Sequence, residues 1–267
     1  MSLQTGESSP ATKQIYHLGD AVFTLKNCDA TFLQTVEKIL PHFTGDPSSH
    51  PEIEEINTGC TKEILDLIRH VASLHQKQKY VWIEASCLLT PTGKKVLIAG
   101  KSQSGKSTTA LALSLGKRWS ILAENLCLIN YDSRRVLKHL APAALDEKAL
   151  EVLLTQGVSP ERTYSLEWRK NRVWAPVLDV IGERTFDPNF DLAIWLERDD
   201  QADSSFSVNP ISSGEFARKA LTVSNLLKIK GSSDSFFDSI AQAKCLTVTG
   251  GELNQRLDTI TGAVSST

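Results

Sequence analysis

The chain has 267 residues, of which 41% are hydrophobic and 22% charged, a composition typical of globular proteins that bury a sizeable core. Its formal net charge is −2 and its pI about 6.3, so no overall basic field favours a nucleic acid or an anionic membrane as partner. No apolar stretch reaches the roughly 20 residues of a membrane span, and the polar N-terminus lacks the apolar core of a signal peptide. The five cysteines form no metal-binding pattern, and we expect a cytoplasmic protein with reduced thiols.

The first part of the chain predicts a small α+β region over residues 16–78, after a loose N-terminus at 1–15. Apolar residues recur at helical spacing in two stretches, and turn-forming residues separate them. The elements expected here are, in chain order, a strand at 22–25, a helix over 30–40, a turn-rich stretch at 42–51 and a helix over 61–75.

The second part, residues 79–261, alternates apolar strand patterns with helical ones, which predicts an α/β domain with a sheet flanked by helices. The expected strands are 81–83, 86–89, 95–99, 120–123, 126–129, 192–196 and 245–248, and the expected helices are 108–115, 146–155, 213–227 and 252–260. The first of these helices is expected to end at Gly116, because glycine readily adopts the left-handed conformation of a C-cap. Residues 158–189 show no clear periodicity, and a loose C-terminus is expected at 262–267.

A glycine-rich loop joins the strand at 95–99 to the next helix and reads GKSQSGKS over residues 100–107, with the spacing of a phosphate-binding loop. In such a loop, backbone N–H groups converge on phosphate oxygens, and the positive end of the following helix adds to the attraction. Lys106 is expected to reach the terminal phosphates and Ser107 to bind Mg²⁺ through its hydroxyl. The nucleotide-binding residues predicted are Gly100, Lys101, Ser102, Gln103, Ser104, Gly105, Lys106, Ser107 and Thr108.

A magnesium–nucleotide site also needs an acidic residue near the metal, and two strand ends offer one. Glu124 directly follows the strand at 120–123, shortly after the helix of the loop. Glu197 directly follows the longer apolar run at 192–196, as the metal-side acid does in ordinary P-loop NTPases. The residues alone leave the choice between the two open.

Most of the chain from about residue 65 onward resembles the HPr kinase/phosphatase superfamily, in particular its diverged HPr-kinase-related branch. The resemblance rests on IEASCLL (83–89), the loop with the helix TTALALSLG after it, and ILAENL (121–126), and residues 191–198 and 208–216 are similar in pattern. It implies a P-loop-containing mixed sheet of the HPr-kinase/PEP-carboxykinase type. It also implies ATP- and Mg²⁺-dependent transfer of the γ-phosphate to a hydroxyl of a peptide, protein or small molecule, with the metal-binding and catalytic carboxylate at Glu124 rather than Glu197.

Two departures from the family pattern bear on catalysis. The family's acidic pair is here Glu124-Asn125, so that one carboxylate remains, and Glu84 aligns where the family has a histidine. Glu84 in that place would act as the base for the substrate hydroxyl, or as an ion-pair partner of Lys106. Two other functions therefore stay open: a nucleotide-binding regulatory or scaffold module without phosphoryl transfer, and an ATPase or GTPase that uses Glu197.

The expected ligands are ATP, Mg²⁺ and an unidentified hydroxyl-bearing substrate, with no nucleic acid and no membrane as partner; self-association into a homo-oligomer is left open. Basic residues of the irregular segment are candidates for a phosphate or substrate clamp, or else for a solvated loop: Arg162, Arg169, Lys170, Arg172 and Arg184. Trp168 and Trp174 are candidates either for stacking on adenine or for anchoring that segment to the core. The six histidines show no catalytic or metal-binding spacing, and none is assigned chemistry.

Overall fold

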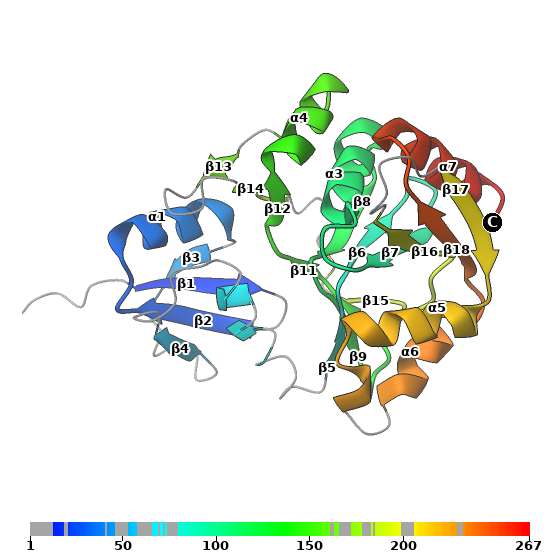
Figure 1. The fold of residues 1–267 in the computed structure, drawn as a ribbon. Helices are drawn as coiled ribbons and strands as arrows, with labels where there is room; N and C mark the ends of the chain where they lie inside the picture. The colour runs from blue at the N-terminus through cyan, green and yellow to red at the C-terminus, as the bar shows by residue number, and fades with distance from the viewer. Residues whose placement is uncertain are drawn as a thin grey trace, which may run out of the picture.

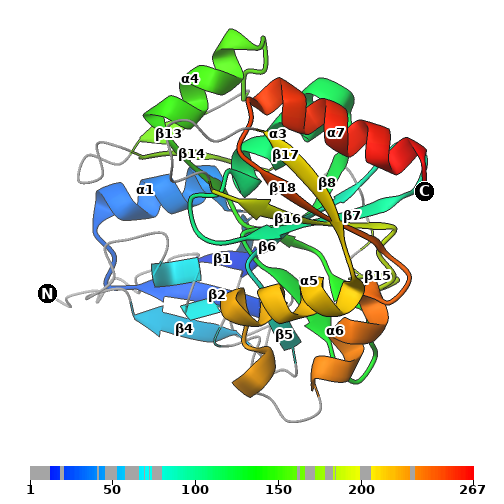
Figure 2. The same ribbon diagram turned by 45° about the vertical axis from the view of Figure 1, so that its right-hand side comes forward.

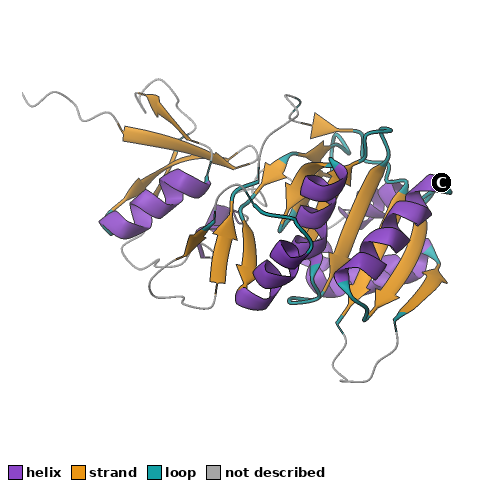
Figure 3. Cartoon of the chain, turned by 90° about the horizontal axis from the view of Figure 1, so that it is seen from above, coloured by secondary structure: helices purple, strands orange, loops and turns teal. Residues whose placement is uncertain are grey.

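The structure, a computed structural model, consists of an N-terminal α+β lobe followed by a larger α/β body (Figure 1). Seen from above, the lobe lies at one side of the body, and helices lie on both faces of the body's strands (Figure 3). No helix in the described part of the chain is long and apolar enough to cross a membrane. The structure describes residues 13–18, 21–40, 42–45, 53–57, 66–68, 70–71, 73, 80–160, 163–165, 172–177, 183, 185–198, 206–228 and 232–267.

The N-terminal lobe contains a four-stranded sheet with one helix packed on it. Its elements are β1 (Lys13–Leu18), β2 (Ala21–Lys26), α1 (Ala30–Ile39), β3 (His42–Gly45) and β4 (Glu54–Asn57). The strands lie in the order β3-β1-β2-β4. Helix α1 begins after Asp29, whose carboxylate accepts hydrogen bonds from the backbone N–H groups of Thr31 and Phe32.

Three strands of the lobe lie where the sequence predicted none. β1 begins inside the stretch expected to be loose, and β3 lies in the stretch expected to be turns. β1 and β3 pair antiparallel with each other, and this non-local pairing outweighs the local preference for turns. β4 lies in a stretch to which no element was assigned, and it pairs in parallel with β2. Of the helix expected over 61–75, residues 66–68, 70–71 and 73 are helical, and the rest of that span lies outside the described residues.

The body is built on a seven-stranded mixed sheet in the order β11-β8-β6-β7-β16-β18-β17. These strands are β6 (Ala85–Leu89), β7 (Lys95–Gly100), β8 (Ser120–Glu124), β11 (His139–Leu140), β16 (Leu192–Glu197), β17 (Ser207–Ile211) and β18 (Lys244–Thr249). β7, β16 and β18 are parallel, and β8 runs the same way because β6 is antiparallel to both β7 and β8. The carboxyl ends of these four strands therefore meet at one edge of the sheet.

Helices cover both faces of this sheet (Figures 1 and 2). On one face lie α3 (Lys106–Lys117), α4 (Glu147–Thr155) and α7 (Leu253–Ser265), and on the other α5 (Ser213–Ala220) and α6 (Ser232–Ile240). Each face has its own apolar core, in which strand residues alternate between the α3 side and the α5 side. The predicted α/β class, a mixed sheet flanked by helices, is confirmed.

Two smaller sheets complete the body. The first has the order β15-β10-β9-β5 and the second β12-β14-β13. Their strands are β5 (Tyr80–Ile83), β9 (Cys127–Asn130), β10 (Val136–Leu137), β12 (Ala143–Asp146), β13 (Tyr164–Ser165), β14 (Arg172–Ala175) and β15 (Thr185–Phe186). β5 leads into β6 through the single residue Glu84, which places Glu84 at the carboxyl edge of the main sheet.

Three helix ends differ from the sequence prediction. The helix expected over 213–227 ends at Ala220 and gives way to 3₁₀ turns, because the backbone of residues 223–225 hydrogen-bonds to β5 and Glu84 instead. Helix α3 runs through Gly116, and Arg118 takes the left-handed C-cap conformation with φ 58°. Helix α7 continues to Ser265, past the expected end at 260 and into the C-terminus expected to be loose at 262–267, because Ala263 and Val264 are buried.

Candidate functional site

The loop of residues 100–107, called the GKS loop from here on, lies at the carboxyl edge of the main sheet between β7 and α3. Gly100, the last residue of β7, is the register partner of Leu196 in β16. On the other side of β7, Ala99 pairs with Ala85 of β6. Glu84 directly precedes Ala85 and therefore lies beside the end of β7. The GKS loop therefore lies among the ends of β6, β7 and β16.

Two glycines of the GKS loop stand where a side chain would not fit. A Cβ atom at Gly100 would lie 2.4 Å from the backbone oxygen of Leu196. Gly105 has φ +91°, which L side chains rarely adopt, and a Cβ there would lie 2.7 Å from Nη1 of Arg256. Glycine at both positions lets the loop backbone approach its neighbours closely.

The Lys106 ammonium folds back over the GKS loop. Its Nζ donates hydrogen bonds to the backbone oxygens of Gly100 at 2.7 Å and Lys101 at 2.8 Å. Burial lowers the pKa of Lys106, and the charges of Glu84 and Glu124 act in the opposite direction. The charge is thus held at the loop by two neutral carbonyl groups.

Glu124, at the end of β8, places a buried carboxylate against the first turn of α3. Its Oε1 accepts a hydrogen bond from Ser107 Oγ at 2.5 Å, and its Oε2 accepts one from Ser86 Oγ at 2.6 Å. The backbone N–H of Asn125 also hydrogen-bonds to this carboxylate. Burial raises the pKa of Glu124, and these hydrogen bonds and the Lys106 charge oppose that effect.

The backbone around Glu124 is held by contacts that the sequence did not predict. Asn125 adopts a left-handed conformation with φ 68°, and the N–H of Leu126 donates to the Glu124 backbone oxygen at 2.8 Å. Nδ1 of the buried His139 lies 3.2 Å from the same oxygen. Ser86 and His139 reach Glu124 through the pairing of β6 and β11 with β8, and no spacing along the chain signals such contacts.

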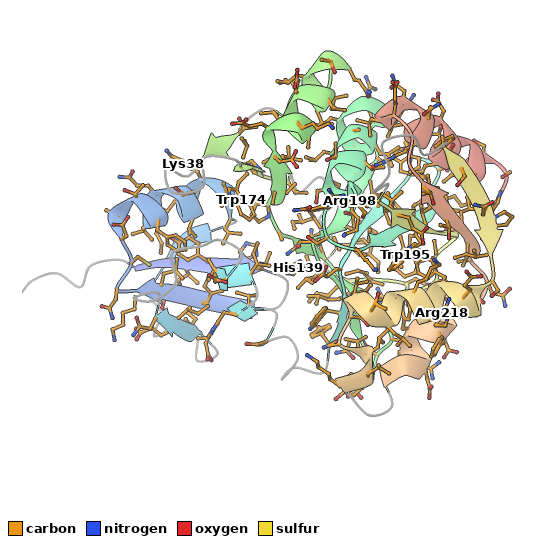
Figure 4. All side chains as sticks on the ribbon, in the orientation of Figure 1. Lys38, His139, Trp174, Trp195, Arg198 and Arg218 are labelled. Atoms are coloured by element: carbon orange, nitrogen blue, oxygen red, sulfur yellow. The ribbon has the colours of Figure 1, made fainter. Side chains whose placement is uncertain are left out.

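Glu197, the other candidate for the metal-binding carboxylate, lies on the α5 side of the sheet. Its Oε1 accepts a hydrogen bond from Lys219 Nζ at 2.6 Å, and its Oε2 accepts one from Thr249 Oγ1 at 3.3 Å. Lys219 lowers the pKa of Glu197. Trp195, two residues earlier in β16, packs edge-on against Phe216 of α5 (Figure 4). Side chains two residues apart in a strand lie on the same face, so Glu197 also faces α5 and not α3.

Glu84 lies half-buried in the link between β5 and β6. Its backbone N–H donates to the Val223 oxygen at 2.8 Å, which fixes the link. Glu84 is near enough to Lys106 for its charge to raise the pKa of that side chain, but the two form no ion pair among the described residues. Glu84 therefore lies on the loop's side of the sheet without being held to Lys106.

The remaining candidates divide into described and undescribed residues. In the GKS loop, Lys101, Ser102 and Gln103 are exposed, Ser104 is buried and Thr108 half-buried in α3. Gln103 Oε1 accepts a hydrogen bond from Arg198 Nη1 at 2.7 Å.

Trp174 is buried in the core that joins the body to the N-terminal lobe, which removes it as an adenine-stacking candidate. Outside the described residues lie Arg162, Trp168, Arg169, Lys170, Arg184 and, except for its backbone, Arg172.

Ser107 and Glu124 together offer the oxygen ligands that Mg²⁺ prefers. No group of three or more His, Cys, Asp or Glu residues among those described is arranged to hold a metal ion. Magnesium at nucleotide sites does not need such a group, because it keeps several waters and binds one or two carboxylates together with the phosphates. One hydroxyl and one carboxylate at the start of α3 fit this pattern.

Comparisons with known proteins leave the family open: no protein-family model matches the chain, and no curated protein matches it significantly.

Proposed function

We propose that this protein is an ATP- and Mg²⁺-dependent kinase of the HPr-kinase-like type, which transfers the γ-phosphate to a hydroxyl of a peptide, protein or small molecule. The observation that carries the proposal is the hydrogen bond from Ser107 to Glu124. It joins the hydroxyl that follows the loop's lysine to the buried carboxylate at the end of β8, on the same edge of the sheet, as a magnesium–nucleotide site requires. When bound there, Mg²⁺ would neutralise negative charge on the phosphates.

The other residues of the site take roles that follow from their positions. The backbone N–H groups of the GKS loop and the N-terminus of α3 would bind phosphate oxygens. Lys106 would exchange its two carbonyl partners for the β- and γ-phosphates, since an ammonium binds a charged oxygen more strongly than a neutral one. Glu84, on the same side of the sheet, would accept the proton of the attacking hydroxyl.

A second function is favoured by Asn125. Where the resemblance implies a second carboxylate, the chain has an amide in a left-handed turn, so a single carboxylate serves the site. A nucleotide-binding regulatory or scaffold module would use the GKS loop, Ser107 and Glu124 for binding but would not transfer the γ-phosphate.

The proposal is tested by measuring Mg²⁺-ATP binding and transfer of labelled γ-phosphate to acceptors in an extract. We expect Mg²⁺-ATP to raise the melting temperature, since a ligand of the folded state stabilises it, and Lys106→Ala to remove most of that shift. Glu84→Gln should lower turnover about 10²- to 10⁴-fold, the usual contribution of a placed base, and change ATP affinity no more than about threefold.

Glu197→Gln is the matched control, because it removes the same charge at the neighbouring strand end on the face of α5. It should leave both binding and transfer near the wild-type level. Binding without transfer in the wild-type protein would favour the regulatory module. An unchanged melting-temperature shift in Lys106→Ala would contradict both functions.

A further inference from the structure

Arg256, near the start of α7, connects the GKS loop to the turn that follows β18. Its Nε donates a hydrogen bond to the backbone oxygen of Gly250 at 2.8 Å, and its Nη1 donates one to the backbone oxygen of Ser104 at 3.3 Å. The guanidinium group thus bridges two segments that are about 150 residues apart in the chain. The planar fork of an arginine suits such a bridge, because its donors point in fixed, different directions.

The guanidinium also packs directly on the backbone of the GKS loop. A Cβ atom on Gly105 would lie 2.7 Å from Arg256 Nη1, so no other residue type leaves this contact undisturbed. Gly105 immediately precedes Lys106, the first residue of α3. Arg256 therefore restrains the two residues whose backbone leads into the helix N-terminus.

The charge of Arg256 has no anionic partner among the described residues. Its hydrogen bonds to described residues go to two neutral carbonyl oxygens, and no described carboxylate forms an ion pair with it. Burial lowers its pKa, although an arginine stays protonated in proteins. A half-buried cation without a counter-ion is unfavourable, and an anion bound in the loop would compensate it.

We propose that Arg256 is a positioning residue for the GKS loop, which it holds in the conformation that receives phosphate, and that its charge raises the affinity of the loop for phosphate groups. The inference rests on the proposed nucleotide function, and it adds α7 to the elements that build the site. No pattern in the sequence singles out this arginine, because its contacts with Ser104 and Gly105 arise only from the packing of α7 beside α3.

The first measurement follows the loop without any ligand. Hydrogen exchange of residues 100–107 should become faster in Arg256→Gln, because that variant loses the bridge between Ser104 and Gly250. Arg218→Gln is the matched control: it makes the same charge change at an exposed position on α5, away from the loop (Figure 4). Exchange of the loop in the control should equal that of the wild-type protein.

The second measurement uses inorganic pyrophosphate, ATP and adenosine as probes in calorimetry. Arg256→Gln should weaken pyrophosphate and ATP binding about 10- to 100-fold, the usual effect of losing a charge-assisted contact, and leave adenosine binding unchanged. Arg256→Lys keeps the charge but loses the guanidinium bridge, and it should recover only part of the lost affinity. A purely structural role would weaken the three probes together and would not be rescued by lysine.

The outcomes separate this inference from the proposed function. Wild-type loop exchange and wild-type pyrophosphate affinity in Arg256→Gln would overturn the inference even if ATP binds. A wild-type protein that binds neither pyrophosphate nor ATP would refute the proposed function, and faster loop exchange in Arg256→Gln would still support the positioning role. Should Arg256→Gln fail to fold, Arg256→Lys replaces it, since its single ammonium cannot reproduce the guanidinium bridge; wild-type exchange in that variant would overturn the role.

Discussion

The carboxylate of Glu124 is almost completely removed from water, with 1% of the residue exposed, and burial raises its pKa. Two serine hydroxyls and a backbone N–H satisfy its oxygens, but the unfolded chain would solvate the charge better. An ionised Glu124 is therefore unfavourable for folding at neutral pH. Buried groups with shifted pKa values are often kept for function, and Mg²⁺ would restore the missing opposite charge.

Glu124→Gln is expected to raise the melting temperature at pH 7. The pKa of Glu124 in the folded protein lies above the ordinary value of 4.5, so between the two values the native state binds more protons than the unfolded state. Stability of the wild-type protein therefore falls as the pH rises through this window. The pH-dependent part of the gain should shrink as the pH falls towards 4.5 and vanish well below it, where the carboxyl is protonated in both states. Thermal unfolding of the wild-type protein and the variant from pH 4 to 8 measures this difference in melting temperature.

Glu197→Gln provides the comparison of opposite sign. Lys219 lowers the pKa of Glu197, so this carboxylate stabilises the fold above the ordinary pKa of 4.5 and loses that contribution as the pH falls through the lowered value. Its replacement should lower the melting temperature slightly at pH 7, because a single, partly solvent-accessible ion pair contributes little. Equal effects of the two substitutions at pH 7 would contradict the assignment of Glu124 as the buried, functionally retained acid.

The site residues that the sequence predicted are those with a local sequence pattern. Lys106, Ser107 and Glu124 follow from spacing within one loop and one strand end, and the structure brings them together. Ser86 and Arg256 touch the same site through strand pairing and helix packing, and neither carries a pattern of its own. Contacts between residues distant in the chain were therefore the part that sequence could not predict.

Helix α3 shows how packing moves the end of an element. The sequence predicted the C-cap at Gly116, but the N–H groups of Arg118 and Trp119 both bond to the Leu113 backbone oxygen, and Trp119 is buried. Burial of the tryptophan after the cap extends the helix by one residue beyond glycine and forces Arg118 into the left-handed conformation. The long apolar strands, by contrast, were predicted well, because their burial and their local preference agree.

Gly116→Ala and Arg118→Gly are each expected to stabilise the protein. Gly116 is exposed within the helix, and an added Cβ would meet Val158 at an ordinary contact distance of 3.6 Å, so alanine should gain about 1 kcal/mol. Glycine at 118 would relieve about 1–2 kcal/mol of left-handed strain and cost about 0.5–1 kcal/mol of backbone entropy, a net gain of about 0.5–1 kcal/mol. Urea unfolding measures both. If α3 ended at Gly116 in a left-handed cap, alanine there would destabilise the protein instead.

At the scale of the whole molecule, the N-terminal lobe and the body share one apolar cluster. It joins lobe residues such as Phe23 and Val36 to Ala141 and Trp174 of the body, and Trp174 is one of the largest fully buried side chains. The sequence predicted a small α+β region over residues 16–78, because the pattern becomes rich in strands from residue 80 onward. It offered Trp174 as an anchor of its segment to the core, but it could not identify the lobe as the partner, because that segment has no periodicity.

Trp174→Ala is therefore expected to loosen the lobe before the rest of the molecule. Removal of a buried tryptophan side chain costs about 3–5 kcal/mol, and here the cavity would open between the lobe and the body. Hydrogen exchange should accelerate in β1, β2 and α1, while the GKS loop and β16 keep their wild-type rates. Trp174→Phe should have a much smaller effect, since it keeps most of the apolar contact. Leu154→Ala, at a half-exposed position on α4, is the control and should change neither region. Equal acceleration in the lobe and in β16 would mean that the two parts unfold as one unit, contrary to this prediction.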